Sequence, residues 1–145
     1  MSIPTILVIE DNVADQVLIR YALDAIGEPY RFEVLPDGEA ALTFVNDHRA
    51  GRRKHEPCVI LLDLHLPRYN GIEVLTAIRR EPFLTHIHVF VLTSDASPAE
   101  RIQVIELDGI CCIKPSGLEE MKALAAEILA ACKEPRERLA EPAMR

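Results

Sequence analysis

The chain has 145 residues, of which 49% are hydrophobic and 27% charged, and its formal net charge is −7. This size and composition are ordinary for one soluble globular domain that can bury a substantial core. The acidic balance, without a basic stripe, argues against a nucleic-acid partner held through its phosphates. The short basic cluster at Arg49, Arg52, Arg53 and Lys54 is interpreted as solvated surface.

No membrane or secretion signal is visible in the sequence. Residues 1–4 lack a basic start, and the apolar runs are far too short to span a bilayer. The four cysteines, Cys58, Cys111, Cys112 and Cys132, lack the spacing of metal ligands or redox motifs. A reducing compartment suits such cysteines, so we expect a cytoplasmic protein without a membrane partner.

Hydrophobic periodicity alternates between strands and helices along the whole chain. The predicted order is strand 6–9, helix 15–26, strand 30–35, helix 39–48, strand 58–63, helix 72–80, strand 87–92, helix from about 98, strand 110–113 and helix 118–132. Residues 133–145 are charged and contain two prolines, so we expect a flexible tail. The chain is therefore expected to hold one domain at 1–132 and no output domain.

Apolar residues at helical spacing predict the buried face of each helix. These residues are Val17, Leu18, Tyr21, Ala22 and Ala25, then Ala41, Phe44, Val45 and His48, then Ile72, Leu75 and Ile78, then Ile102 and Ile105, and finally Leu118, Met121, Leu124, Ala125, Ile128, Leu129 and Cys132. Four of the strands, including 110–113, are continuous enough to be buried on both faces. Five such strand–helix units predict an α/β fold, a doubly wound parallel sheet of five strands with five helices.

Polar residues follow four of these strands where they end. Glu10 and Asp11 follow the first strand, Asp63 ends the third, Thr93 follows the fourth and Lys114 follows the fifth. In open α/β sheets, ligands bind at the carboxyl ends of the strands. Clustered carboxylates require a cation or a raised pKa, and oxygen ligands suit Mg²⁺ together with a phosphate. A lysine and a hydroxyl can then bind phosphoryl oxygens, which favours a metal-and-phosphate site.

These residues closely resemble the receiver domain of two-component response regulators. The matching pieces are Ile6–Asn12, Leu61–Pro67 with Gly71, Leu92–Ser94 and Ile113–Pro115, and the resemblance covers about residues 4–132. It implies the flavodoxin-like strand order 2-1-3-4-5. The run Glu10-Asp11-Asn12 with Asp15, the long loop before Cys58 and the run Leu92–Asp95 are most similar to stand-alone receivers associated with bacterial phytochromes.

The resemblance also implies a role for each polar residue. Asp63 would be the phosphoacceptor, and Asp11, Asp63 and the backbone carbonyl of His65 would bind Mg²⁺, with Glu10 acting mostly through water. Lys114 would contact a phosphoryl oxygen, and Thr93 would swing toward the phosphoryl group. His65 and Asp95 occupy positions that influence the lifetime of the phosphorylated state. Gly71 is interpreted as a backbone turn residue.

Two places depart from the family pattern. Gly109 lies about one residue nearer Lys114 than is usual, which indicates a shortened loop. Three positions before Lys114, where an aromatic switch residue is usual, this chain has Cys111. The phosphorylation chemistry does not need the aromatic ring, but the usual coupling to the threonine does. We therefore expect the output face of the fourth helix, fifth strand and fifth helix to signal differently or weakly.

The resulting prediction is a single-domain response regulator that is a switch and not an enzyme. Its partners would be a sensor histidine kinase, with a bacteriophytochrome as a candidate, and a downstream or phosphotransfer protein. A homodimer through the output face or the fifth helix is a further alternative. Two rival functions are a receiver-shaped module without phosphorylation and a Mg²⁺-dependent phosphohydrolase. The second would need a general-acid aspartate at the position of His65.

Overall fold

A single parallel sheet organises the protein. The computed structural model describes residues 3–51 and 56–136. The strands are β1 (Thr5–Ile9), β2 (Arg31–Leu35), β3 (Val59–Asp63), β4 (His88–Thr93) and β5 (Ile110–Ile113). They pair in the order β2-β1-β3-β4-β5, and every pairing is parallel. The predicted doubly wound sheet and its strand order are thus confirmed.

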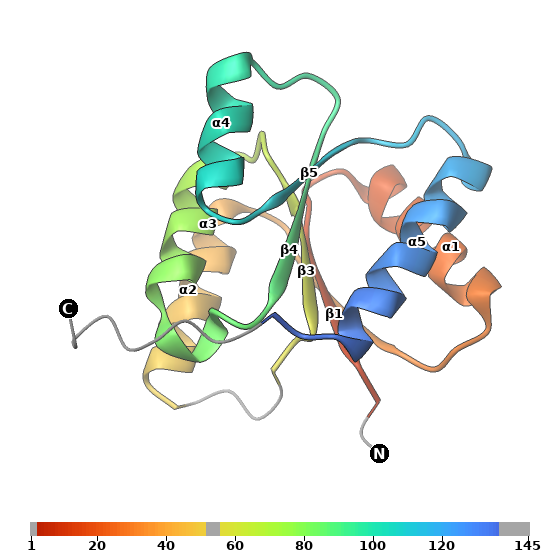
Figure 1. Ribbon diagram of the computed structural model, residues 1–145, viewed down its shortest axis with the longest axis horizontal. Coiled ribbons are helices and arrows are strands. Elements are labelled where there is room, and N and C mark those ends of the chain that lie inside the picture. The colour runs from red at the N-terminus through yellow and green to blue at the C-terminus, as the bar shows by residue number, and fades with distance from the viewer. Residues whose placement is uncertain (1–2, 52–55, 137–145) are drawn as a thin grey trace.

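Helices cover both faces of this sheet (Figure 1). The helices are α1 (Val13–Ile26), α2 (Gly38–Arg49), α3 (Gly71–Arg80), α4 (Pro98–Glu106) and α5 (Leu118–Lys133), with a short 3₁₀ helix η1 (Pro82–Leu84). One core cluster lies between the sheet and α2, α3 and α4, and the other lies between the sheet and α1 and α5. The alternation of strand side chains between these two clusters explains why β1, β3 and most of β4 are fully buried.

The predicted inward faces hold for α2 and α5, are partly wrong for α1 and are wrong for α4. In α1, Val17 and Tyr21 are 60% and 61% exposed, whereas the predicted Ala22 is buried together with Ile19 and Leu23. Two neighbouring stripes of α1 are apolar, and packing against α5 selects one of them. In α4, Ile102 and Ile105 are 57% and 63% exposed, and Val104 is buried.

Strand β5 is also more exposed than its sequence predicts. Ile110 and Ile113 are 40% and 73% exposed because β5 is the outermost strand of the sheet. Cys111 and Cys112 point to opposite clusters, and both are only half buried. The apolar continuity of the run does not distinguish this edge strand from a central one.

A disulfide joins two distant parts of the chain. Cys58, just before β3, is bonded to Cys132 near the end of α5, at a sequence separation of 74. This bond removes the cysteine-based argument for a reducing compartment. Among the described residues, no helix is long and apolar enough to cross a membrane.

The chain remains in contact with the domain beyond α5. The backbone amide of Arg136 donates to the carbonyl of His86, and its guanidinium pairs with Asp108 at 3.0 Å. The remainder of the predicted tail, residues 137–145, and the basic residues Arg52, Arg53 and Lys54 lie outside the described residues.

Candidate functional site

The phosphoacceptor candidate Asp63 lies at the carboxyl end of the central strand β3, and only 6% of it is exposed. Its Oδ1 accepts the backbone amide of His65 at 3.0 Å, which holds the loop after β3 against the carboxylate. The amide of Gly71 donates to the carbonyl of Leu64 at 2.7 Å and closes the same loop. A Cβ at Gly71 would lie 2.7 Å from the Cα of Leu64, so this glycine permits a close approach of the α3 start to the loop.

Glu10 and Asp11 follow β1 at the same edge of the sheet. The side chain of Asn12 accepts the amide of Asp15 at 3.1 Å and caps α1, which fixes the chain as it leaves the strand. The amide of Asn12 in turn donates to Oε2 of Glu10 at 3.1 Å. Glu10 is 2% exposed, whereas Asp11 is open to solvent.

Three carboxylates form a compact oxygen cluster at this edge. One oxygen each from Glu10, Asp11 and Asp63 lies within 4.8 Å of the others. Hard divalent cations prefer such oxygen ligands, and an exposed Asp11 leaves the cation open to water and substrate. The donor set therefore fits a magnesium ion bound together with a phosphoryl group.

Lys114 provides the positive charge of the site. Its Nζ lies 3.1 Å from Oε1 of Glu10, 3.4 Å from Oδ2 of Asp63 and 2.9 Å from Oδ2 of Asp15. From the sequence, Asp15 is named only as part of the family resemblance, and it is not predicted to be a site residue. Asp15 is the third residue of α1, in the first turn after the Asn12 cap. A side chain in the first turn of this helix lies at the same edge of the sheet, and this position could have indicated its role.

Burial and charge set the protonation of two of these groups. Burial raises the pKa of Glu10 to about 7, with the charge of Asp63 adding to the effect and the amide of Asn12 and Lys114 opposing it. Burial lowers the pKa of Lys114, but hydrogen bonds to Asp15 and Glu10 and the charge of Asp63 raise it above its usual range overall. Lys114 is therefore a permanent cation in the cluster.

Thr93 ends β4 next to this cluster, and its side chain is engaged with the following loop. Its Oγ1 accepts the backbone amide of Asp95 at 3.1 Å. A groove of about 370 Å³ lies beside it, and Cys111 lies in the wall of this groove. The small cysteine side chain leaves open the space that a bulkier switch residue would fill.

His65 links the loop after β3 to α4. Its Nε2 lies 3.3 Å from Oε2 of Glu100, in the first turn of α4. The amide of Ser97 and the contact with His65 lower the pKa of Glu100, so it is a carboxylate near neutral pH. Glu100 is a second residue of this region that the sequence did not single out.

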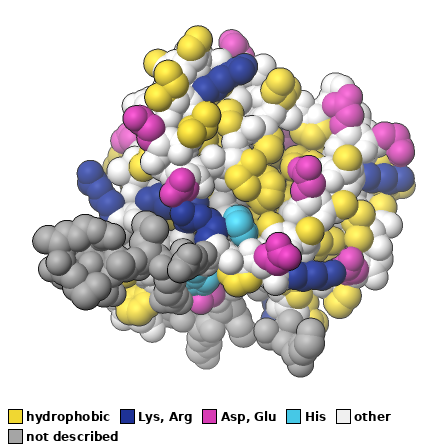
Figure 2. Space-filling view, in the orientation of Figure 1, with side chains coloured by type: hydrophobic (Ala, Val, Ile, Leu, Met, Phe, Trp, Pro, Cys, Tyr) yellow, Lys and Arg dark blue, Asp and Glu magenta, His cyan; other side chains and the backbone are white. Residues whose placement is uncertain are grey.

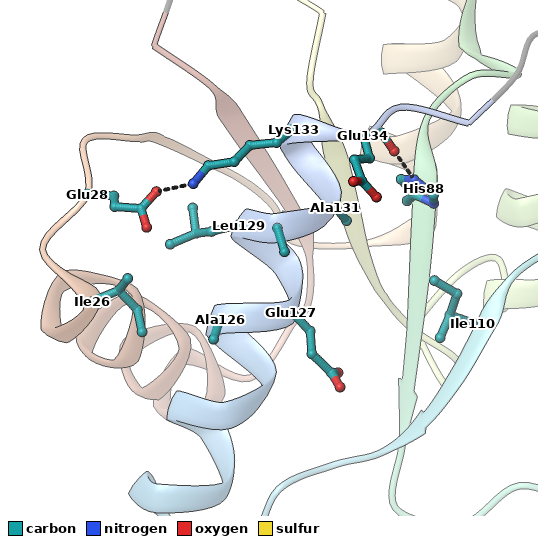
Figure 3. A pocket seen from close by; sticks show the side chains of 11 residues that line it. Ile26, Glu28, His88, Ile110, Ala126, Glu127, Leu129, Ala131, Lys133 and Glu134 are labelled. Atoms are coloured by element: carbon teal, nitrogen blue, oxygen red, sulfur yellow. Dashed lines mark hydrogen bonds and ion pairs between the residues drawn. The ribbon is translucent and has the colours of Figure 1, made fainter.

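A larger groove lies at the opposite edge of the sheet, between α5 and the starts of β4 and β5 (Figure 3). Its volume is about 600 Å³, and its walls include Ile110, Leu129 and Ala126. Nε2 of His88 donates to the carbonyl of Glu134 at 2.7 Å on one side, and Lys133 pairs with Glu28 on the other. None of the carboxylates of the metal cluster lines this groove.

Comparison with known proteins assigns the chain to a described family. A family model described as "Response regulator receiver domain" matches residues 6–126. The probable methanogenesis regulatory protein FilR2 of Methanothrix harundinacea is 40% identical over 124 residues, which cover 85% of this chain and 79% of that protein. The response regulator Rcp1 of Synechocystis sp. is 35% identical over 111 residues, which cover 77% of this chain and 76% of Rcp1.

Two solved structures share the fold over nearly the whole chain. The Mn²⁺-bound form of Rcp1 has a TM-score of 0.77 and 31% identity, covering 94% of this chain and 99% of that one. The phosphorylated cyanobacterial phytochrome response regulator RcpA has a TM-score of 0.80 and 28% identity, covering 92% and 96% of the two chains. The predicted similarity to phytochrome-associated regulators is thus confirmed.

Proposed function

Because this chain belongs to the receiver-domain family of two-component response regulators, we propose that it accepts a phosphoryl group on Asp63 from a sensor histidine kinase. The convergence of Asp63, Lys114 and two further carboxylates at one edge of the sheet is the observation that supports this proposal. A switch of this kind has no product to release, and receiver domains are generally switches without enzymatic turnover.

Asp63, Lys114 and Thr93 each have a different role in the proposed reaction. An oxygen of Asp63 forms a bond to phosphorus while the bond from phosphorus to the kinase histidine breaks, and the imidazole keeps the electron pair and takes up a proton. Lys114 holds the Asp63 carboxylate in place and then binds a phosphoryl oxygen as a fixed cation. The hydroxyl of Thr93 would leave the Asp95 amide to donate to a second oxygen.

Mg²⁺ would be held by Asp11, Asp63 and the backbone carbonyl of His65, with Glu10 acting mostly through water. When bound, the ion neutralises negative charge on the phosphoryl oxygens. The Mn²⁺-bound form of Rcp1 shows that a relative binds a divalent cation. Both oxygens of Glu10 already have partners, the amide of Asn12 at 3.1 Å and Nζ of Lys114 at 3.1 Å, which supports an indirect role for this residue.

The signal would leave through the face formed by α4, β5 and α5, which we call the output face. Figure 2 shows hydrophobic side chains gathered on this side of the molecule. Ile102, Ile105, Ile110 and Ile113 are the large apolar side chains exposed there. Exposed patches of this kind mark protein contacts, so the face would receive a downstream or phosphotransfer protein, or a second copy of the chain. Phosphorylation by a kinase that uses cellular ATP would require a cytoplasmic location.

Incubation with Mg²⁺ and acetyl phosphate tests the central claim. The intact protein should gain the mass of one phosphoryl group, which hydroxylamine removes, and Asp63→Asn should abolish the gain. Asp37→Asn is the matched control, because asparagine can still cap α2. An unchanged wild-type mass would support the module without phosphorylation, and a gain that survives Asp63→Asn would refute Asp63 as the phosphoacceptor. Multiple turnover of phosphate esters would instead support a phosphohydrolase.

A further inference from the structure

Glu100 uses its two carboxylate oxygens for two different contacts. Oε1 accepts the backbone amide of Ser97 at 2.9 Å and completes the capping box of α4. Oε2 lies 3.3 Å from Nε2 of His65 in the loop after β3. Nε2 carries a hydrogen in one neutral tautomer and in the cation, so it can donate to Oε2 in either state. The second contact is not needed for the cap.

The His65 end of this contact reaches the phosphoacceptor directly. The backbone amide of His65 donates to Oδ1 of Asp63, while its side chain reaches α4. Within residues 3–51 and 56–136, this is the one side-chain hydrogen bond from α4 to another element. One residue therefore contacts both the site of phosphorylation and the helix at the edge of the output face.

The alternative route to the output face, through Thr93 and β5, has a cysteine where an aromatic ring is usual in the family. Cys111 and Thr93 line the same groove of about 370 Å³, whose walls also include Ile105 and Ile113. If the signal depended on movement of the side chain at position 111, a cysteine would offer few atoms to repack. The His65–Glu100 contact crosses the neighbouring gap between β3 and α4 and does not depend on Cys111.

We propose that phosphorylation of Asp63 breaks the His65–Glu100 contact and thereby loosens the first turn of α4. A phosphoryl group adds negative charge beside the His65 amide, which attracts the imidazole and repels the Glu100 carboxylate. The His65 side chain is 52% exposed, so it can rotate without a change of the backbone. This inference rests on the proposed phosphorylation of Asp63 and adds Glu100 as a positioning residue that holds His65.

The two oxygens of Glu100 allow a clean test with Glu100→Gln. Glutamine keeps one oxygen for the Ser97 amide, since it also forms capping boxes, but it cannot present a carboxylate to His65. Hydrogen exchange of the amides at residues 100–104 would be measured with Mg²⁺ alone and with Mg²⁺ and beryllofluoride, a phosphoryl mimic. In the wild type these amides should exchange about two- to fivefold faster with beryllofluoride, as expected for the loss of one partly exposed side-chain contact.

Glu100→Gln should show the faster exchange already without beryllofluoride and little further change when it is added. Adding His65→Ala to this variant should have no further effect, because both substitutions remove the same contact. Glu106→Gln removes the same charge at the far end of α4 and should respond like the wild type. A Glu100→Gln protein that retains the full response overturns the link to α4. A wild type that forms no acyl phosphate overturns the proposed function, and the two failures are therefore distinguishable.

Discussion

Lys114 lies closer to Asp15 than to the phosphoacceptor Asp63, at 2.9 Å against 3.4 Å. Asp15 comes from the first turn of α1 and Lys114 from the loop after β5, 99 residues apart in the sequence. The lysine is therefore shared between the carboxylate that would be phosphorylated and one that is 35% exposed at the margin of the site. Asp15 thus adds a fourth negative charge to the surroundings of the metal cluster.

Asp15→Asn should weaken Mg²⁺ binding by about three- to tenfold, because a divalent cation loses attraction to one nearby charge and Lys114 moves closer to the cluster. Isothermal titration with MgCl₂ at low ionic strength measures this change. Asp24→Asn removes the same charge from the exposed side of α1 and should leave the affinity nearly unchanged. Equal affinities for the two variants would show that Asp15 does not act on the site.

Gly71→Ala should destabilise the fold by about 1–3 kcal/mol and slow phosphorylation of Asp63. The new Cβ would lie 2.7 Å from the Cα of Leu64 and 2.8 Å from the carbonyl oxygen of Asp63, and backbone atoms cannot move aside cheaply. Urea unfolding and acetyl phosphate labelling measure the two effects. Gly117→Ala is the control because a Cβ there meets nothing within 4 Å. Similar losses in both variants would argue against close packing as the cause.

Reduction of the Cys58–Cys132 disulfide should lower the free energy of unfolding by roughly 4 kcal/mol, the chain-entropy value for a loop of this length. Urea unfolding with and without a phosphine reductant gives the difference. The double variant Cys58→Ser/Cys132→Ser should be insensitive to the reductant, while a variant with serine at Cys111 and Cys112 should keep the wild-type response. Identical wild-type midpoints under the two conditions would contradict the prediction.

Cys112 should react slowly with iodoacetamide. Burial, assisted by the charges of Glu127 and Cys111, raises the pKa of the Cys112 thiol to about 11, so little of the reactive thiolate exists near pH 8. In a Cys111→Ser background, alkylation of the native protein should be about tenfold slower than in urea, after allowing for the higher nucleophilicity of a more basic thiolate.

The pH profile separates this effect from simple shielding of Cys112. The rate in the native protein should still rise with pH between 9 and about 10.5, because the folded-state pKa is raised. The rate in urea should level off near the ordinary thiol pKa of about 8.5. Mass spectrometry of quenched samples gives both curves, and a native plateau at the same pH as in urea would refute the raised pKa.

The parts of the fold that the sequence predicts are those determined by local pattern. Polar residues stand at or directly after the ends of β1, β3, β4 and β5, and this is visible in the sequence. Once the strands are parallel, these residues must lie at the same edge of the sheet. The exposure of Ile113 depends on which strand lies at the edge of the sheet, and that of Ile105 depends on which side of α4 packs inward. An apolar pattern encodes neither. The pairs Lys114–Asp15 and Cys58–Cys132 join distant segments, and no local spacing indicates them.

The bond between Cys58 and Cys132 also limits how two copies of this protein could associate. Exchange of a terminal helix between protomers is a low-cost route to dimers. Here the end of α5 is covalently joined to the residue before β3, so α5 cannot leave its own sheet while the bond is intact. Two copies that each hold this bond must therefore associate through complete surfaces, and the bond has to be reduced before α5 can be exchanged between them.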